Sequence, residues 1–230
     1  MKIDKMMLSI GIISFFLIIL SLNVNPRYRK HSLKDKGISK KHKNENTIDI
    51  VPLSFISVTI PLTLFFRIFR SLELELDQEI LSYVSFLSCQ LFITAIVENL
   101  KNLCGRLRPD FLARCRPVEN ICTGFGKTIK DGRKSFPSGH SATSAGGFFY
   151  AVFFINSHTT NHSNTLISQN KIVKKFVTFI FILIPFIVGF TRYFDNRHHI
   201  TDILAGLTIG LISSRIFYKY SEISLIDLEK

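Results

Sequence analysis

The stretch KSFPSGHSATSAGGFFYAVFFINS, residues 134–157, joins a polar turn to an apolar run. From Ser141 to Ser157 it contains no Asp, Glu, Lys or Arg, so it lacks the charged face of a helix on a soluble protein. A helix that is apolar all round lies in a protein core or in a bilayer. The number of similar runs elsewhere in the chain decides between the two.

Six runs lack acidic and basic side chains, at residues 7–24, 50–66, 80–97, 141–157, 176–191 and 203–214. A membrane-spanning helix needs roughly 20 residues, and modest extension into the flanks brings five runs to that length. The last reaches it only as residues 199–218, which puts Asp202 near one membrane face and Arg215 near the other. The sequence predicts an all-α integral membrane protein with about six transmembrane helices, and argues against a soluble helical bundle.

The chain is basic as well as apolar. Its 230 residues carry a formal net charge of +12 and 47% are hydrophobic, which excludes a disordered basic tail. We expect an anchor helix with a basic linker (1–49), a polytopic domain (50–220) and a short polar tail (221–230). The alternative for the first run is a cleaved signal peptide, but 18 uncharged residues are long for one and no A-x-A site follows.

The loops on the two sides of the predicted membrane differ in charge. One side, which we call side A, comprises residues 25–49, 98–140 and 192–202 and holds 19 basic and 9 acidic residues. The other side holds 10 basic and 8 acidic residues. The positive-inside rule therefore places side A in the cytoplasm. The linker at 25–46 has no periodicity and is most simply a solvated loop.

Three segments of side A carry candidate chemistry, and the first is KNLCGRLRP, residues 101–109. Lys101 and Arg108 are seven residues apart, so on one helix they share a face and can clamp an anion. Pro109 then ends or diverts the helix. The structural alternative is a basic cap at the membrane boundary.

The second segment is the turn before residues 141–157. Ser138 and Gly139 can present backbone N–H groups at a helix N-terminus, which suits phosphate binding, and His140 would lie beside that anion. An ordinary N-cap with an interfacial histidine is the alternative.

The third segment is TRYFDNRHHITD, residues 191–202. His198 and Asp202 are four residues apart, so on a helix Asp202 can accept the imidazole N–H and leave His198 a free nitrogen as nucleophile. His199 is rotated by about 100° from that face.

Together K-x6-R-P (101–109), P-S-G-H (137–140) and R-x5-H-x3-D (192–202) resemble the type 2 phosphatidic acid phosphatase family of lipid phosphate phosphatases. The resemblance covers residues 84–218 and is strongest to the eukaryotic branch that hydrolyses phosphatidate and diacylglycerol pyrophosphate. Where the family usually has Ser-Arg, this chain has Thr191-Arg192, which keeps the hydroxyl. The resemblance implies a helical core like that of acid phosphatases and vanadium haloperoxidases.

The resemblance also implies roles. Lys101, Arg108 and Arg192 would bind the phosphoryl oxygens, with Ser138 and the Gly139 amide. His198 would attack phosphorus, His140 would protonate the departing lipid oxygen, and Asp202 would orient His198. The implied partners are the bilayer and lipid phosphates such as phosphatidate, lysophosphatidate and diacylglycerol pyrophosphate, with no nucleic acid. Nothing in the sequence predicts an oligomeric state.

No metal or other cofactor is expected. The acidic residues of side A show no convergent spacing, and the sequence lacks the D-x-D-x-T, C-x5-R and G-x-S-x-G motifs of other hydrolases. Activity should therefore be independent of magnesium. The alternatives are a lipid phosphotransferase on the same fold and a non-catalytic lipid-binding scaffold, although a scaffold would be expected to lose some of the motif residues.

The family topology opposes the charge count. It places both termini in the cytosol and side A in the lumen or outside the cell, on an endomembrane or the plasma membrane, and we adopt it. Cys115 and Cys122 then lie in an oxidising space and can form a disulfide, the alternative being four free thiols. The sequon at Asn161 would stay unmodified, whereas a glycan there would support the charge count.

Overall fold

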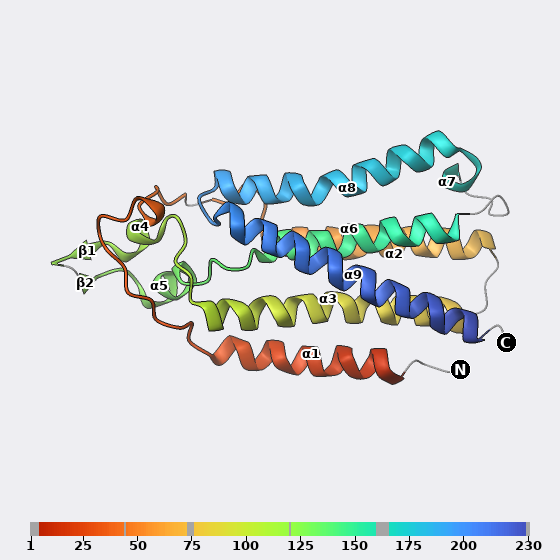
Figure 1. The fold of residues 1–230 in the computed structure, drawn as a ribbon, viewed down its shortest axis with the longest axis horizontal. Helices are drawn as coiled ribbons and strands as arrows, with labels where there is room; N and C mark the ends of the chain where they lie inside the picture. Colours follow the sequence, from red (N-terminus) through yellow and green to blue (C-terminus); the bar gives the residue numbers. More distant parts are fainter. Residues whose placement is uncertain (1–4, 44, 73–75, 120, 160–165, 229–230) are drawn as a thin grey trace.

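The computed structural model describes residues 5–43, 45–72, 76–119, 121–159 and 166–228. Within these residues six long helices run alongside one another, and a cap of loops and short elements closes one end (Figure 1). The long helices are α1 (Lys5–Asn23), α2 (Ile50–Leu72), α3 (Leu76–Cys104), α6 (Gly139–His158), α8 (Lys171–Phe194) and α9 (Ile200–Leu228). They coincide with the six apolar runs.

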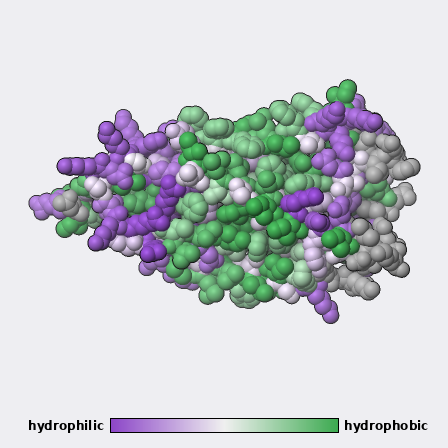
Figure 2. Space-filling model, viewed as in Figure 1, coloured by the Kyte–Doolittle hydropathy of each residue, from purple (hydrophilic) through white to green (hydrophobic). Residues whose placement is uncertain are grey.

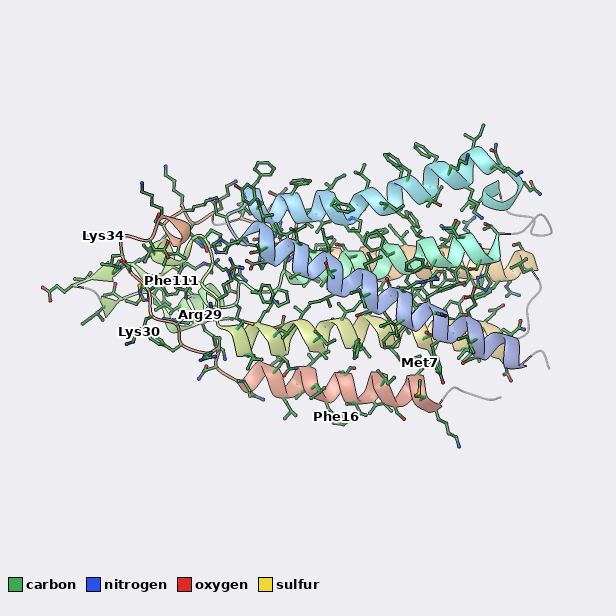
Figure 3. All side chains as sticks on the ribbon, viewed as in Figure 1. Met7, Phe16, Arg29, Lys30, Lys34 and Phe111 are labelled. Carbon is green, nitrogen blue, oxygen red and sulfur yellow. A yellow bond between two sulfur atoms is a disulfide. The ribbon has the colours of Figure 1, made fainter. Side chains whose placement is uncertain are left out.

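The outer surface of the bundle is apolar. Phe15 and Phe16 on α1 and Phe176 and Phe190 on α8 are each more than half exposed. Figure 2 shows a broad apolar band between two polar ends, and Figure 3 shows Phe16 directed away from the bundle. Five helices, α1, α2, α3, α8 and α9, are long and apolar enough to cross a membrane. The chain is therefore a multi-pass membrane protein.

Helix α6 is the enclosed helix of the bundle. Thirteen of its 20 residues are buried, and it packs against α2, α3, α8 and α9. A Cβ added at Gly147 would lie 2.1 Å from the Ser57 carbonyl oxygen of α2, and one at Gly210 of α9 would lie 2.5 Å from that of Ala142. Small residues thus let the backbones approach closely. That α6 also crosses the bilayer stays a prediction.

The half of the bundle away from the cap is packed with aromatic rings. The centroids of Phe65 and Phe154 lie 4.2 Å apart, and those of Phe86 and Tyr150 lie 5.1 Å apart. All four side chains are at most 1% exposed. This cluster joins α2, α3 and α6 into one apolar core. The short helix α7 (Leu166–Gln169) lies at the same end (Figure 1).

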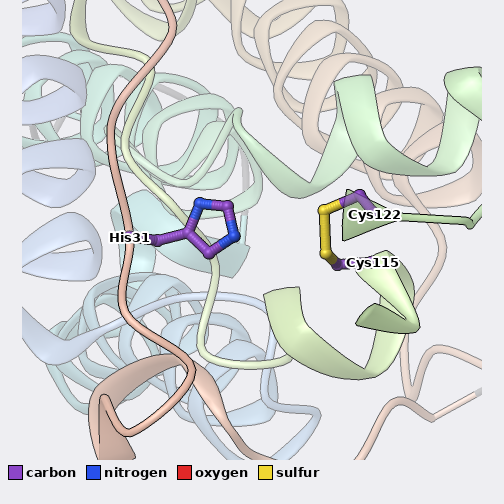
Figure 4. Close-up of side chains that lie close together, drawn as sticks. All are labelled: His31, Cys115 and Cys122. Carbon is purple, nitrogen blue, oxygen red and sulfur yellow. A yellow bond between two sulfur atoms is a disulfide. The ribbon is translucent and has the colours of Figure 1, made fainter. Parts of the chain in front are cut away.

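The cap is built from the linker before α2 and from the segment between α3 and α6. The first contains the short 3-10 helix η1 (Lys36–Ile38). The second contains α4 (Phe111–Cys115), the antiparallel pair β1 (Pro117–Val118) and β2 (Ile121–Cys122), and α5 (Gly126–Gly132). Cys115 and Cys122 form a disulfide beside His31 (Figure 4), whereas Cys89 and Cys104 are free.

The basic linker contacts the end of the bundle along much of its length. The backbone N–H of Arg27 donates to the Asn102 carbonyl (2.8 Å), and Arg29 donates its Nε–H to the Cys104 carbonyl (2.7 Å). Figure 3 shows Arg29, Lys30 and Lys34 on this segment, at the cap end. Most of the described residues in 25–46 are nonetheless exposed, so the prediction of a solvated loop is confirmed, and these contacts attach that loop to the bundle. At the other end of the chain, α9 runs past residue 220 to Leu228.

Candidate active site

A cavity of about 480 Å³ lies where the cap meets the bundle. Six of the eight predicted site residues line it: Lys101, Arg108, Gly139, His140, Arg192 and His198. They come from α3, the loop after it, α6, α8 and the loop before α9. Ser138 and Asp202 are buried and do not line the cavity. Chain segments up to 97 residues apart thus meet at one place.

The cavity is rich in positive charge. Its lining includes five cations (Lys101, Arg108, Lys134, Arg192 and Arg197) and two carboxylates (Glu98 and Asp131). The carboxylates hold the cations in place: Glu98 pairs with Lys101 at 2.5 Å and with Lys134 at 3.8 Å, and Asp131 pairs with Arg108 at 2.9 Å. Since cations exceed carboxylates, the cavity is suited to an anion with several charged oxygens.

Lys101 and Arg108 both line the cavity, but they do not lie on one helix as predicted. Helix α3 ends at Cys104, because Gly105 adopts a left-handed conformation with φ of 54°. Lys101 is therefore on the last helical turn and Arg108 in the loop beyond it. The expectation that one helical face carries both cations was wrong; the chain turn brings them together instead.

The turn before α6 is organised as a helix N-cap. Ser138 accepts from the Ser141 N–H and donates its own N–H to the Asp202 carbonyl at 2.9 Å. Gly139 lines the cavity, and a Cβ there would lie 3.1 Å from Lys101 Nζ. Glycine thus leaves room for the ammonium group. The positive end of the α6 dipole adds to the anion-attracting field of the cavity.

Arg192 and His140 meet at the wall of the cavity. Arg192 is fully buried apart from that wall, with Nη1 3.2 Å from His140 Nε2 and Nη2 2.7 Å from the Asp195 carboxylate. His140 Nε2 also lies 3.2 Å from the Ile48 carbonyl oxygen. A guanidinium fixed from one side by a carboxylate can present its remaining N–H groups to a ligand.

His198 is oriented by a backbone carbonyl. Its Nδ1 lies 2.6 Å from the Ser135 carbonyl oxygen but 3.9 Å from Asp202 Oδ2, so the direct hydrogen bond predicted between His198 and Asp202 is not formed. Asp202 instead accepts from the Ser135 hydroxyl (2.6 Å), the His199 N–H (2.8 Å) and Arg106 (2.6 Å). Asp202 and His198 are therefore linked through Ser135, whose hydroxyl donates to Asp202 and whose carbonyl oxygen lies against Nδ1 of His198.

Burial keeps His198 neutral. It lowers the pKa of His198 to about 4, with a further contribution from the positive charge of Arg108 and a partial offset from Asp202. A neutral imidazole with Nδ1 engaged can use Nε2 as a nucleophile at physiological pH. The neighbouring His199 points elsewhere, with Nε2 3.1 Å from the Leu107 carbonyl oxygen.

Several residues of the site were not predicted. Asn46 of the linker lines the cavity, and the Ser135 carbonyl orients His198. Asn46 lies in a polar stretch without periodicity, so nothing in the sequence marks it. A carbonyl contact cannot be read from a side-chain motif at all, although Ser135 lies within the quoted KSFPSGH segment.

Among the described residues, His31, Cys115 and Cys122 form the one group of three or more potential metal ligands whose ligand atoms all lie within 4.8 Å of one another. Figure 4 shows that the two sulfur atoms are bonded to each other, so neither is available as a thiolate ligand.

A membrane-embedded bundle with two histidines in a cation-lined cavity at its end defines a class of protein: an enzyme acting on an anionic group at a bilayer surface. Residues 82–224 match the PAP2 superfamily, and the chain belongs to that family. It is a hydrolase of the phosphatidate phosphatase type.

Named relatives agree with this assignment. The chain is 30% identical to diacylglycerol pyrophosphate phosphatase 1 of Saccharomyces cerevisiae over 89% of its own length and 77% of the relative. It is 30% identical to probable lipid phosphate phosphatase 4 of Arabidopsis thaliana, over 76% of this chain and 58% of that one. It is also 30% identical to the probable diacylglycerol pyrophosphate phosphatase 1 of Schizosaccharomyces pombe, over 84% and 72%. No solved structure matches the chain.

Proposed function

We propose that this protein hydrolyses the phosphomonoester or pyrophosphate of phosphatidate-like lipids through a phosphohistidine intermediate. The observation that carries the proposal is His198: a neutral, buried imidazole tied at Nδ1 to the Ser135 carbonyl, in a cavity lined by five cations. The relatives are named for phosphatases of lipid phosphates and of diacylglycerol pyrophosphate, which supports the substrate class.

The proposed reaction has two steps. His198 Nε2 attacks phosphorus, so that a P–N bond forms while the bond from phosphorus to the lipid oxygen breaks. Burial and the charge of Arg192 lower the pKa of His140 to about 3, and the negative charge of the bound phosphoryl group opposes them, so that His140 takes up a proton with the substrate and gives it to the departing oxygen. A water molecule then attacks the phosphohistidine and passes a proton to His140. A P–O bond forms while the P–N bond breaks, which releases inorganic phosphate and regenerates neutral His198. Lys101, Arg108 and Arg192 stabilise the charge on the phosphoryl oxygens in both steps, as phosphoryl transfer requires.

The proposal includes independence from metal ions. The positive charge that a magnesium ion supplies in other phosphoryl-transfer enzymes is supplied here by fixed cations and by the α6 N-terminus. The two carboxylates of the cavity, Glu98 and Asp131, are each paired with a cation. Activity is therefore expected to persist in excess EDTA, and complete inhibition would contradict this part of the proposal.

We place the active site on the lumenal or extracellular side of an endomembrane or the plasma membrane. The disulfide between Cys115 and Cys122, in the cap beside the site, supports this orientation because disulfides persist in oxidising compartments. The excess of basic residues on the same side has a functional reason, since five of them line the cavity. The sequon at Asn161 lies outside the described residues.

The test is phosphate release from short-chain phosphatidate in detergent micelles with excess EDTA. Wild type should release phosphate, and His198→Ala should reduce the rate by about a thousandfold or more because the nucleophile is lost. The matched control is His199→Ala, which removes the adjacent imidazole outside the cavity and should leave most activity. Equal activity of wild type and His198→Ala would contradict the phosphohistidine mechanism, and inactivity of wild type on a panel of lipid phosphates would contradict the function.

A further inference from the structure

The end of the linker contacts two segments that build the active site, the loop before α9 and helix α6. We call residues 41–43 and 45–48 the strap. The side chain of Asn196 donates to the Lys41 carbonyl (3.1 Å), and Arg197 donates to the Lys43 carbonyl (2.7 Å) and to the Asn46 side chain (3.0 Å). These contacts bridge 151 to 155 positions of sequence. The strap is thus fixed to the loop that carries His198.

Within the strap, Thr47 holds a buried carboxylate with two donors. Its backbone N–H donates to Asp195 Oδ2 (2.9 Å) and its hydroxyl donates to Asp195 Oδ1 (2.6 Å). Asp195 Oδ2 lies 2.7 Å from Nη2 of Arg192. Burial alone would raise the pKa of Asp195, but the two hydrogen bonds from Thr47 and the charge of Arg192 outweigh it and hold that pKa below its usual range. The carboxylate therefore stays ionised beside the guanidinium.

The other side of Arg192 faces the reaction. Nη1 lies 3.2 Å from His140 Nε2, which the Ile48 carbonyl of the strap also contacts at 3.2 Å. Thr47 and Ile48 are consecutive, so adjacent residues of the strap contact the partners of both ends of the guanidinium. The Arg192 side chain has four rotatable bonds. A carboxylate that Thr47 holds in place beside its guanidinium excludes most of the rotamers that would turn the guanidinium away from the cavity.

We propose that Thr47 is a positioning residue for phosphate binding: by locking Asp195 from outside the motif segments, it fixes Arg192 in the orientation that presents its guanidinium to the phosphoryl group. The role of Arg192 toward a phosphoryl group rests on the proposed function. The contact chain from Thr47 to Asp195 to Arg192 does not. The linker, which resembles nothing in the motif segments, thereby becomes part of the active site.

The test compares Thr47→Val with Thr47→Ser in the full-length protein. Valine keeps the branched shape and the backbone donor but loses the hydroxyl, whereas serine keeps the hydroxyl. Because a hydrogen bond to a charged group is lost, Thr47→Val should lower kcat/KM about tenfold or more, and Thr47→Ser should stay within about threefold of wild type. Thr59→Val is the matched control, since the Thr59 hydroxyl donates to the Phe55 carbonyl of its own helix.

A second readout does not depend on catalysis. Inorganic phosphate should raise the melting temperature of the wild-type protein, and Thr47→Val should need about tenfold more phosphate for the same shift. In an Asp195→Asn background, adding Thr47→Val should have little further effect if Thr47 acts through Asp195. This readout separates the positioning role from the choice of lipid substrate.

Each result either supports or overturns the positioning role of Thr47. Reduced phosphate binding in Thr47→Val that Thr47→Ser restores, with an unchanged melting temperature in the absence of phosphate, supports the role. Wild-type phosphate binding in Thr47→Val overturns it. A fall in the phosphate-free melting temperature that accounts for the whole effect, or full additivity with Asp195→Asn, overturns it as well. If the wild type binds phosphate but hydrolyses no lipid phosphate, the proposed function is rejected. Phosphate binding by Thr47→Val and Thr47→Ser then still decides the positioning role.

Discussion

The two halves of the bundle bury opposite kinds of side chain. At the cap end, Asp110, Arg192 and Asp202 are fully buried and every one of them is paired. In the other half, Phe65 and Phe86 are equally buried among rings. Burying paired charges contributes little net stability, whereas burying aromatic rings contributes a great deal. The difference teaches that one half stabilises the fold and the other is organised for binding an anion.

The largest expected effect breaks the aromatic half. Phe65→Ala should lower the free energy of unfolding by about 3–5 kcal/mol, because it removes a fully buried ring and leaves a cavity. Denaturant unfolding in detergent measures the loss, and kcat per folded molecule should not change. Phe16→Ala is the control, since Phe16 is 59% exposed on the outer surface. A fall in kcat that matches the fall in stability would contradict the division of roles.

The next effect is a loss of activity caused by a substitution in the charged half that keeps the positive charge. Arg192→Lys should lower kcat/KM about a hundredfold, because an ammonium cannot contact both His140 and Asp195 with separate nitrogens. The control is Arg70→Lys, an exposed position at the opposite end of the bundle. Retention of activity within a few-fold would mean that positive charge alone suffices at this position.

A smaller effect concerns the covalent link in the cap. Replacing Cys115 and Cys122 together by Ser should lower stability by about 2 kcal/mol, because the bridge closes a loop with a sequence separation of 7. Thermal inactivation should then precede loss of helix content, since the cap carries Arg108 and Asp131 of the cavity. Cys104→Ser, which removes a free thiol, is the control. Simultaneous loss of activity and helix content would show that cap and bundle unfold as one unit.

The smallest effect concerns the pH dependence of activity, which reports the burial of His198 in the charged half. With a pKa of about 4, His198 should remain neutral down to about pH 5, whereas an exposed histidine with a pKa near 6.5 would already be mostly protonated there. Protonation removes the nucleophilic lone pair, so kcat/KM, corrected for ionisation of the lipid phosphate, should show no fall between about pH 7 and about pH 5 and should fall only below that. An acid limb centred near 6.5 in the corrected profile would mean that His198 is not buried in solution.

The fold was predictable because charge-free runs have few alternatives. Each run of residues such as 7–24 or 176–191 became one long helix, since in an apolar environment every backbone group must bond within its own segment. The run at 141–157 predicted a helix but not that neighbouring helices enclose it. Its Gly and Ser residues lower its hydropathy, and only the packed structure shows it enclosed by its neighbours.

The site was predictable in part, for a related reason. Lys101, His140 and His198 were chosen as side chains with phosphate chemistry, and all three line one cavity. Their roles in catalysis stay predictions. Sequence spacing gave two wrong predictions of geometry. Gly105 ends α3 before Arg108, so Lys101 and Arg108 do not share a helix, and the Ser135 carbonyl, not Asp202, is the direct partner of His198.

By itself the sequence determined that the chain is a multi-pass helical membrane protein with the residues of a phosphatase motif, because hydropathy and side-chain chemistry are properties of the residues themselves. Only the tertiary structure decided which atoms meet. Thr47 reaches Asp195 across 148 positions, and the Ser135 carbonyl reaches His198 across 63. Such contacts depend on where the chain folds back and on backbone atoms common to every residue, so no local pattern in the sequence encodes them.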